Sequence, residues 1–119
     1  MTIITNMVVI LVALLHGYFM VLEMFLWDKP VGLRAFGQSQ EQAKSTRILA
    51  ANQGLYNGFI AAGLGWGVVQ GSAGTDFKVF FLSCVIIAGV YGALTASRKI
   101  FFIQAVPGIL GLILVLVSS

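Results

Sequence analysis

Residues 3–27 read IITNMVVILVALLHGYFMVLEMFLW, and Glu23 is the single charged side chain in this run. About 20 apolar residues in an α-helix, which rises 1.5 Å per residue, cross the ~30 Å hydrocarbon core of a bilayer. The segment Asp28-Lys29-Pro30 ends the run, because charge and proline both oppose continuation of the helix. The stretch predicts a membrane-spanning helix. We expect it to be retained, since Met1–Met7 has no basic residue and no small-residue cleavage site follows.

The composition also indicates a chain surrounded by lipid. Of its 119 residues, 59% are hydrophobic and 9% are charged, whereas soluble domains are about a quarter charged. The net charge of +3 does not indicate nucleic acid, because no basic cluster interleaved with aromatic residues lies outside the apolar runs. A single cysteine, Cys84, excludes an internal disulfide and a cysteine-based metal site. We expect no metal and no cofactor.

Three further apolar stretches follow the first. We therefore expect an all-α integral membrane protein, a four-helix transmembrane bundle forming one domain over residues 1–119, with helices at about 3–27, 40–70, 78–97 and 100–117. Pro107 should kink the last helix and free the carbonyl of Ile103.

The second helix is predicted to begin well outside the apolar run. Ser39 with Gln42 three residues later forms a capping-box pattern. A helix beginning near Gln40 extends about two turns into the cytoplasm before Ile48. The residues between the first two helices, which include Val31, Leu33 and Phe36, suit a segment lying among the lipid headgroups.

Basic residues set the predicted orientation. Six of the seven lie in the first and third loops: Lys29, Arg34, Lys44, Arg47, Arg98 and Lys99. Only Lys78 lies on the other side. By the positive-inside rule these two loops face the cytoplasm and both termini lie outside, as in a multi-pass protein of the bacterial inner (plasma) membrane.

Polar side chains within the spans collect in the cytoplasmic half of the bilayer. From the helix ends, Glu23 lies ~6 Å deep, Gln53 ~8 Å, Asn57 ~14 Å and His16 ~16 Å. The predicted pocket residues are His16, Glu23, Asn52, Gln53, Tyr56, Asn57, Tyr91 and Gln104. Because polar groups in lipid are costly, we expect all of these except Tyr56, for which no side is predicted, to face the inside of one bundle.

Each residue of this set also has a simpler interpretation. Glu23 could pair with Lys29 or Arg34 at the surface, and the amides could join helices by hydrogen bonds. His16 could bond a neighbouring helix, and the tyrosines could be packing residues with satisfied hydroxyl groups. Catalytic signatures such as HExxH, GxSxG or a Walker motif are absent.

Glycines follow four-residue spacing on the second helix, as in Gly54-xxx-Gly58 and Gly63-xxx-Gly67. Small residues at this spacing let helices approach closely. Such faces could serve packing within the chain or a homo-oligomer.

The string Asn52-Gln-Gly-Leu-Tyr-Asn57, with His16, Leu22-Glu23-Met24-Phe25 and Gly89-Val-Tyr-Gly92 around it, resembles a family of small bacterial membrane proteins. That family is catalogued as domain of unknown function 1304. The resemblance covers nearly the whole chain. It implies four membrane helices and no established activity.

Three functions fit these observations. The first is binding or transport of a small lipophilic or amphipathic ligand in a polar pocket of the cytoplasmic leaflet, with membrane lipids around it. The second is a membrane enzyme that performs acid/base chemistry on a lipophilic substrate, with Glu23 or His16 as acid or base. The third is an assembly partner without a ligand. The residues leave open whether the chain is an enzyme.

Overall fold

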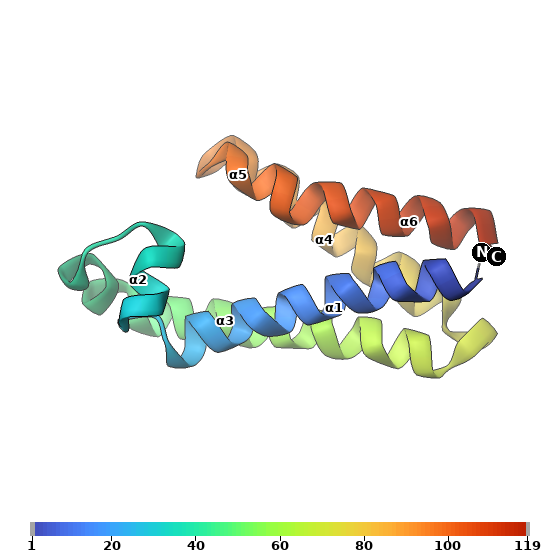
Figure 1. Cartoon of the computed structure of the whole chain (residues 1–119), viewed down its shortest axis with the longest axis horizontal. Coiled ribbons are helices and arrows are strands. Elements are labelled where there is room, and N and C mark those ends of the chain that lie inside the picture. Colours follow the sequence, from blue (N-terminus) through green and yellow to red (C-terminus); the bar gives the residue numbers. More distant parts are fainter. Residues whose placement is uncertain (1, 119) are drawn as a thin grey trace. The chain divides into compact units, whose positions relative to one another are not determined.

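The computed structural model describes Thr2–Ser118, and every regular element in this range is helical (Figure 1). In chain order the elements are α1 (Thr2–Phe25), α2 (Pro30–Phe36), α3 (Gln40–Val69), the 3-10 helix η1 (Gly71–Gly74), α4 (Thr75–Thr95), the single turn α5 (Arg98–Ile100), the π-helix η2 (Phe101–Ala105) and α6 (Val106–Ser118). The all-α prediction is confirmed.

Three helical stretches are long and apolar enough to cross a membrane: Thr2–Phe25, Gly71–Thr95 and Arg98–Ser118. They indicate a membrane-associated protein. The 30-residue helix α3 is long enough but is not among them. Its first turns are charged and its centre carries Asn and Gln side chains, which make it less uniformly apolar than the other three. A fourth span through α3 therefore stays a prediction.

The chain divides into two compact units, which are described separately. Residues Leu14–Ala61 are called the loop unit, and residues Met1–Ala13 together with Ala62–Ser119 are called the terminal unit. Helices α1 and α3 each contribute residues to both. The single-domain prediction for residues 1–119 stays a prediction.

In the loop unit, Ser39 and Gln42 start α3 as predicted. The backbone N–H of Gln42 donates to Ser39 Oγ at 3.1 Å, and the N–H of Ser39 donates to Gln42 Oε1 at 3.0 Å. Two N–H groups that have no partner inside the helix are thereby satisfied. The capping-box prediction is confirmed, and α3 begins at Gln40.

The segment expected among the headgroups forms the short helix α2. Pro30 occupies its first turn, where a missing N–H costs nothing. Gly37 ends it in a left-handed conformation with φ of 60°, which glycine adopts without strain. The periodicity of such a short apolar segment did not predict this helix.

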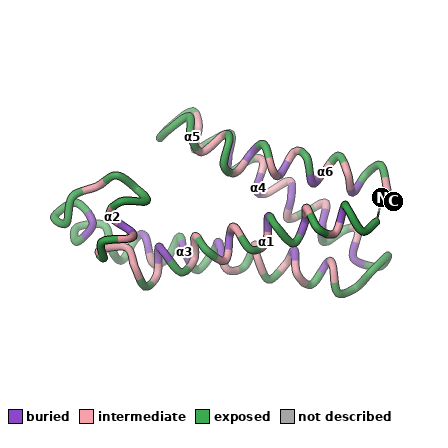
Figure 2. The backbone as a smooth tube through the Cα atoms, viewed as in Figure 1, coloured by how far each residue is buried: buried purple, intermediate pink, exposed green. Residues whose placement is uncertain are grey.

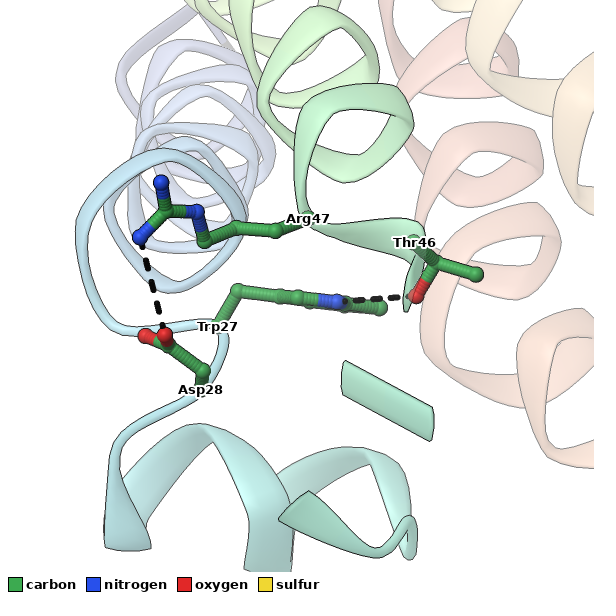
Figure 3. Close-up of polar contacts among 4 residues, drawn as sticks. All are labelled: Trp27, Asp28, Thr46 and Arg47. Atoms are coloured by element: carbon green, nitrogen blue, oxygen red, sulfur yellow. Dashed lines mark hydrogen bonds and ion pairs between the residues drawn. The ribbon is translucent and has the colours of Figure 1, made fainter. Parts of the chain in front are cut away.

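Three contacts tie the residues after α1 to α2 and to the second turn of α3, and Figure 3 shows the two polar ones, Trp27 with Thr46 and Asp28 with Arg47. The Trp27 indole packs on Phe36 with ring centroids 4.7 Å apart, and its Nε1–H donates to Thr46 Oγ1 at 3.1 Å. Arg47 forms an ion pair with Asp28 at 3.7 Å. These contacts fix the beginning of α3 beside the end of α1.

In the terminal unit, α4 packs closely against η2 and α6. A Cβ built on Gly89 would lie 2.6 Å from the backbone N of Ala105, and one on Gly108 would lie 2.9 Å from the Val85 side chain. Ala105 and Val85 are themselves fully buried. Small residues thus bring these backbones together, as in other membrane helix pairs.

The π-helix η2 ends two residues before Pro107. The N–H of Val106 donates to the carbonyl of Phe101, an i→i−5 bond. Because proline supplies no N–H, the hydrogen bonding of the preceding turn has to be rearranged. The predicted kink and the freed carbonyl of Ile103 stay predictions.

Much of the surface of these helices is apolar. Exposed residues recur along every long helix in Figure 2, and Ile48, Leu94 and Leu14 are 82%, 81% and 66% exposed. Exposed apolar surface of this extent is typical of a protein covered by lipid or by partners. It agrees with the three candidate spans.

Candidate functional site

Three polar side chains of the loop unit meet where α1 lies against α3: the buried Glu23 and Asn57, and Gln53, which is exposed but reaches Glu23 with its amide nitrogen. Glu23, two residues before the end of α1, is 3% exposed. Gln53 Nε2 donates to Glu23 Oε2 at 2.7 Å, and Asn57 Nδ2 donates to Glu23 Oε1 at 2.5 Å. Each carboxyl oxygen therefore receives one amide hydrogen. We call Glu23, Gln53 and Asn57 the carboxyl–amide cluster.

Helix geometry explains why two amides reach one carboxyl group. Gln53 and Asn57 are four residues apart, so their side chains project from the same face of α3 one turn apart. Glycines beside them keep the two helices close. A Cβ on Gly54 would lie 2.8 Å from Met24 Cγ and 3.0 Å from Glu23 Cβ, and one on Gly58 would lie 2.7 Å from Met20 Sδ.

The structure excludes the simpler interpretation of Glu23. Its hydrogen-bond partners within the described residues are the two amides, with no lysine or arginine among them. At this end of α1 the ion pair is formed instead by Asp28 with Arg47. Glu23 is thus a buried carboxyl group held by neutral donors. The sequence pattern did not reveal the part played by Arg47, which lies in the predicted second helix.

His16 is fully buried on α1 and its ring packs edge-on against Phe19, with centroids 5.5 Å apart. It lies seven residues before Glu23, or ~10 Å along the helix axis on the same face. The distance is too long for direct contact. His16 is therefore a neighbour of the carboxyl–amide cluster rather than a member of it.

The rest of the predicted set lies elsewhere. Asn52 is exposed, and Tyr56 and Tyr91 are 57% and 68% exposed. Asn52 and Tyr56 stand two residues on either side of Gly54, which places them ~160° around α3 from the face that contacts α1. The expectation that the whole set faces inward is therefore wrong for Asn52 and Tyr91. A ligand-binding role for these residues stays a prediction.

Tyr91 and Gln104 belong to the terminal unit. Gln104 is half-buried within η2. Among the described residues, no three His, Cys, Asp or Glu side chains are grouped so that they could hold a metal ion. The chemistry of the candidate site is thus that of one carboxyl group and two amides.

The model of the family described as "protein of unknown function (DUF1304)" matches residues 10–116. The chain belongs to this family. This DUF1304 protein is 36% identical over 115 residues to the uncharacterized protein YpaA of Lactococcus lactis subsp. lactis (strain IL1403), an alignment that covers 95% of this chain and 97% of that one. No solved structure matches the DUF1304 chain. The resemblance drawn from the Asn52–Asn57 string is confirmed, and it brings no activity with it.

Proposed function

We propose that this protein binds or transports a small, partly apolar ligand whose cationic or hydrogen-bond-donating group meets Glu23. The observation that carries the proposal is the burial of this carboxyl group within a candidate span, held by Gln53 and Asn57. Ionisable side chains inside membrane spans are rare because they are costly, and they mark binding sites and ion or proton pathways.

The arrangement of the donors supports a binding role. A carboxyl group offers about four lone-pair sites, and the two amides occupy two of them. The amides orient the group while leaving its charge uncompensated. A ligand with a cationic or N–H group would gain a charge-assisted hydrogen bond there, and its apolar part would lie against the apolar residues of the spans.

We further propose that α3 is a fourth span, with both termini outside and the Arg34–Lys44 loop in the cytoplasm of a bacterial cell. Gln53 and Asn57 bond to a residue of a candidate span, which supports placing this part of α3 at the same membrane depth. The distribution of basic residues supports the orientation. A cysteine at Gly37, in a Cys84→Ala background, should resist an impermeant thiol reagent in intact cells, while one at Ser72 should react. The reverse pattern would contradict this orientation.

The function is tested with Glu23→Gln, which keeps the shape of the side chain and removes its charge. The matched control is Glu41→Gln, because Glu41 is exposed in the first turn of α3. Binding of tetraphenylphosphonium, a lipophilic cation, is measured by equilibrium dialysis in detergent. Molecules that co-purify are identified by native mass spectrometry.

We expect Glu23→Gln to weaken tetraphenylphosphonium binding by about tenfold or more, because a hydrogen bond to a charged group contributes ~1.5–3 kcal/mol. Any co-purifying molecule should be lost with it. Glu41→Gln should behave as wild type. Equal binding by Glu23→Gln and wild type would favour the assembly role in which the amides only join helices.

A further inference from the structure

Another buried ionisable group lies in the terminal unit. Lys78, in the first turn of α4, is 7% exposed. Its aliphatic stem lies over Gly67, where a Cβ would come within 2.9 Å of Lys78 Cγ. The Nζ donates to Asn6 Oδ1 at 3.1 Å. An ammonium group has three hydrogens, and a neutral amide oxygen accepts one of them without compensating the charge.

A cavity of about 180 Å³ opens beside this lysine. Apart from Lys78 and Asn6, its polar lining consists of hydroxyl side chains: Thr2, Thr5, Ser72, Thr75 and Ser118. Thr5 and Ser118 bond to each other at 2.9 Å, which joins the first turns of α1 to the end of α6. No acidic residue of the described chain lines this cavity, and Asp76 of the same turn is exposed. We call it the Lys78 pocket.

The pocket lies where the three candidate spans begin or end. Residues of the first turns of α1 and α4, of η1 and of the end of α6 line it. The end of a membrane-spanning helix lies at the level of the lipid headgroups, where phosphate groups are concentrated. Lys78 is also the one basic residue outside the two loops that hold the other six. Its burial beside a polar cavity gives a local reason for that position.

We propose that the Lys78 pocket binds a phosphate group. One buried cation beside hydroxyl side chains suits an anion with several acceptor oxygens, because the ammonium contributes a charge-assisted bond. Thr5, Thr75 and Ser118 already donate their hydroxyl hydrogens within the protein, so the neutral bonds to the anion would come from Thr2 and Ser72. The phosphate can belong to an anionic phospholipid or be free in solution. The site is separate from the carboxyl–amide cluster and has the opposite preference for charge.

The test uses the full chain, purified in a neutral detergent and stripped of lipid. Phosphatidylglycerol, phosphatidylcholine and inorganic phosphate are each titrated, the last against sodium chloride at equal ionic strength. Bound lipid is counted by native mass spectrometry, and the shift in thermal unfolding temperature is followed for all three. The variants are Lys78→Gln, Asn6→Asp and the control Lys99→Gln, which removes an exposed basic residue of α5.

We expect Lys78→Gln to weaken binding about tenfold or more. Asn6→Asp keeps the lysine but places a carboxylate beside it, which would take the place of the anion. This variant should fold and should weaken binding as much as Lys78→Gln does. Lys99→Gln should bind as wild type. Binding of phosphatidylglycerol alone assigns the pocket to a lipid headgroup, and binding of inorganic phosphate assigns it to a soluble anion.

The proposal is overturned by either of two results. In the first, wild type binds neither phosphatidylglycerol more tightly than phosphatidylcholine nor phosphate more tightly than chloride. In the second, Asn6→Asp binds the anion as tightly as wild type. The wild-type titration needs no substitution, so it decides the matter even if Lys78→Gln fails to fold.

Discussion

The loop unit buries Glu23 and the terminal unit buries Lys78, and both units partner that side chain with amides rather than with an opposite charge. Gln53 and Asn57 donate to Glu23, whereas Asn6 accepts from Lys78. An amide can do both, because it carries two N–H donors and a carbonyl acceptor. The difference lies in the end of the amide that is used. In both places an ionisable group is held by hydrogen bonds to amides, with no oppositely charged partner among the described contacts.

The strongest test of this difference between the units is to make the same substitution, Asn→Asp, in both of them. Asn57→Asp replaces a donor by a second carboxylate beside Glu23, and we expect it to lower the free energy of unfolding by about 3 kcal/mol. Asn6→Asp places a carboxylate against Lys78, and we expect it to raise the free energy of unfolding by about 1 kcal/mol, since a charge-assisted bond replaces a neutral acceptor.

Both variants can be compared with wild type by thermal unfolding in the same detergent at neutral pH. The two shifts should have opposite signs. Shifts of the same sign would mean that the amides are interchangeable packing residues and that the charges they contact are of little consequence for stability.

A smaller effect separates the two faces of α3. Asn57→Ala leaves one oxygen of the buried Glu23 without its donor, and should cost about 2 kcal/mol of stability. Asn52→Ala removes the same amide from the exposed side of the helix, and should change stability by less than about 0.5 kcal/mol. Thermal unfolding of the two variants checks this. Equal losses would show that Asn52 also has a structural partner.

The contrast between Asn52 and Asn57 shows what could be predicted from the sequence. Position along a helix axis follows from residue number alone at 1.5 Å per residue, so Glu23, Gln53 and Asn57 were expected at similar levels, and they are hydrogen-bonded to one another. Rotation about the helix axis depends on which face packs against a neighbour. Residue number does not give this rotation. Asn52 lies at nearly the same level as Gln53, so it was predicted to face inward, although it lies on the side of α3 away from α1.

A signal for that rotation was present in the glycines. Gly54 and Gly58 mark the face of α3 that approaches α1, because only small residues allow such close contact. Residues one position before each glycine, Gln53 and Asn57, lie at the edge of that face. Positions two away, such as Asn52 and Tyr56, lie on the opposite side. Glycine spacing can therefore orient a helix as well as indicate that it packs.

Other features differ in how far apart in the chain the residues that determine them lie. Ser39 and Gln42 bond within four residues, so their capping box could be predicted from the sequence. The burial of Lys78 could not, because it depends on Asn6, which lies 72 residues away in the chain. The cavity beside it is likewise formed by residues far apart in the chain, from α1, η1, α4 and α6.

The length of α1 has a consequence for the lipid in which this protein is stable. Its 24 residues extend ~36 Å, which exceeds a hydrocarbon core of ~30 Å. If this candidate span crosses a bilayer of ordinary thickness, the helix has to tilt, or its first turns, including Thr5 and Asn6, have to emerge among the headgroups. A thicker bilayer would let α1 stand upright and would draw these two side chains towards the acyl chains. Bilayer thickness thus sets how much water reaches the first turns of α1.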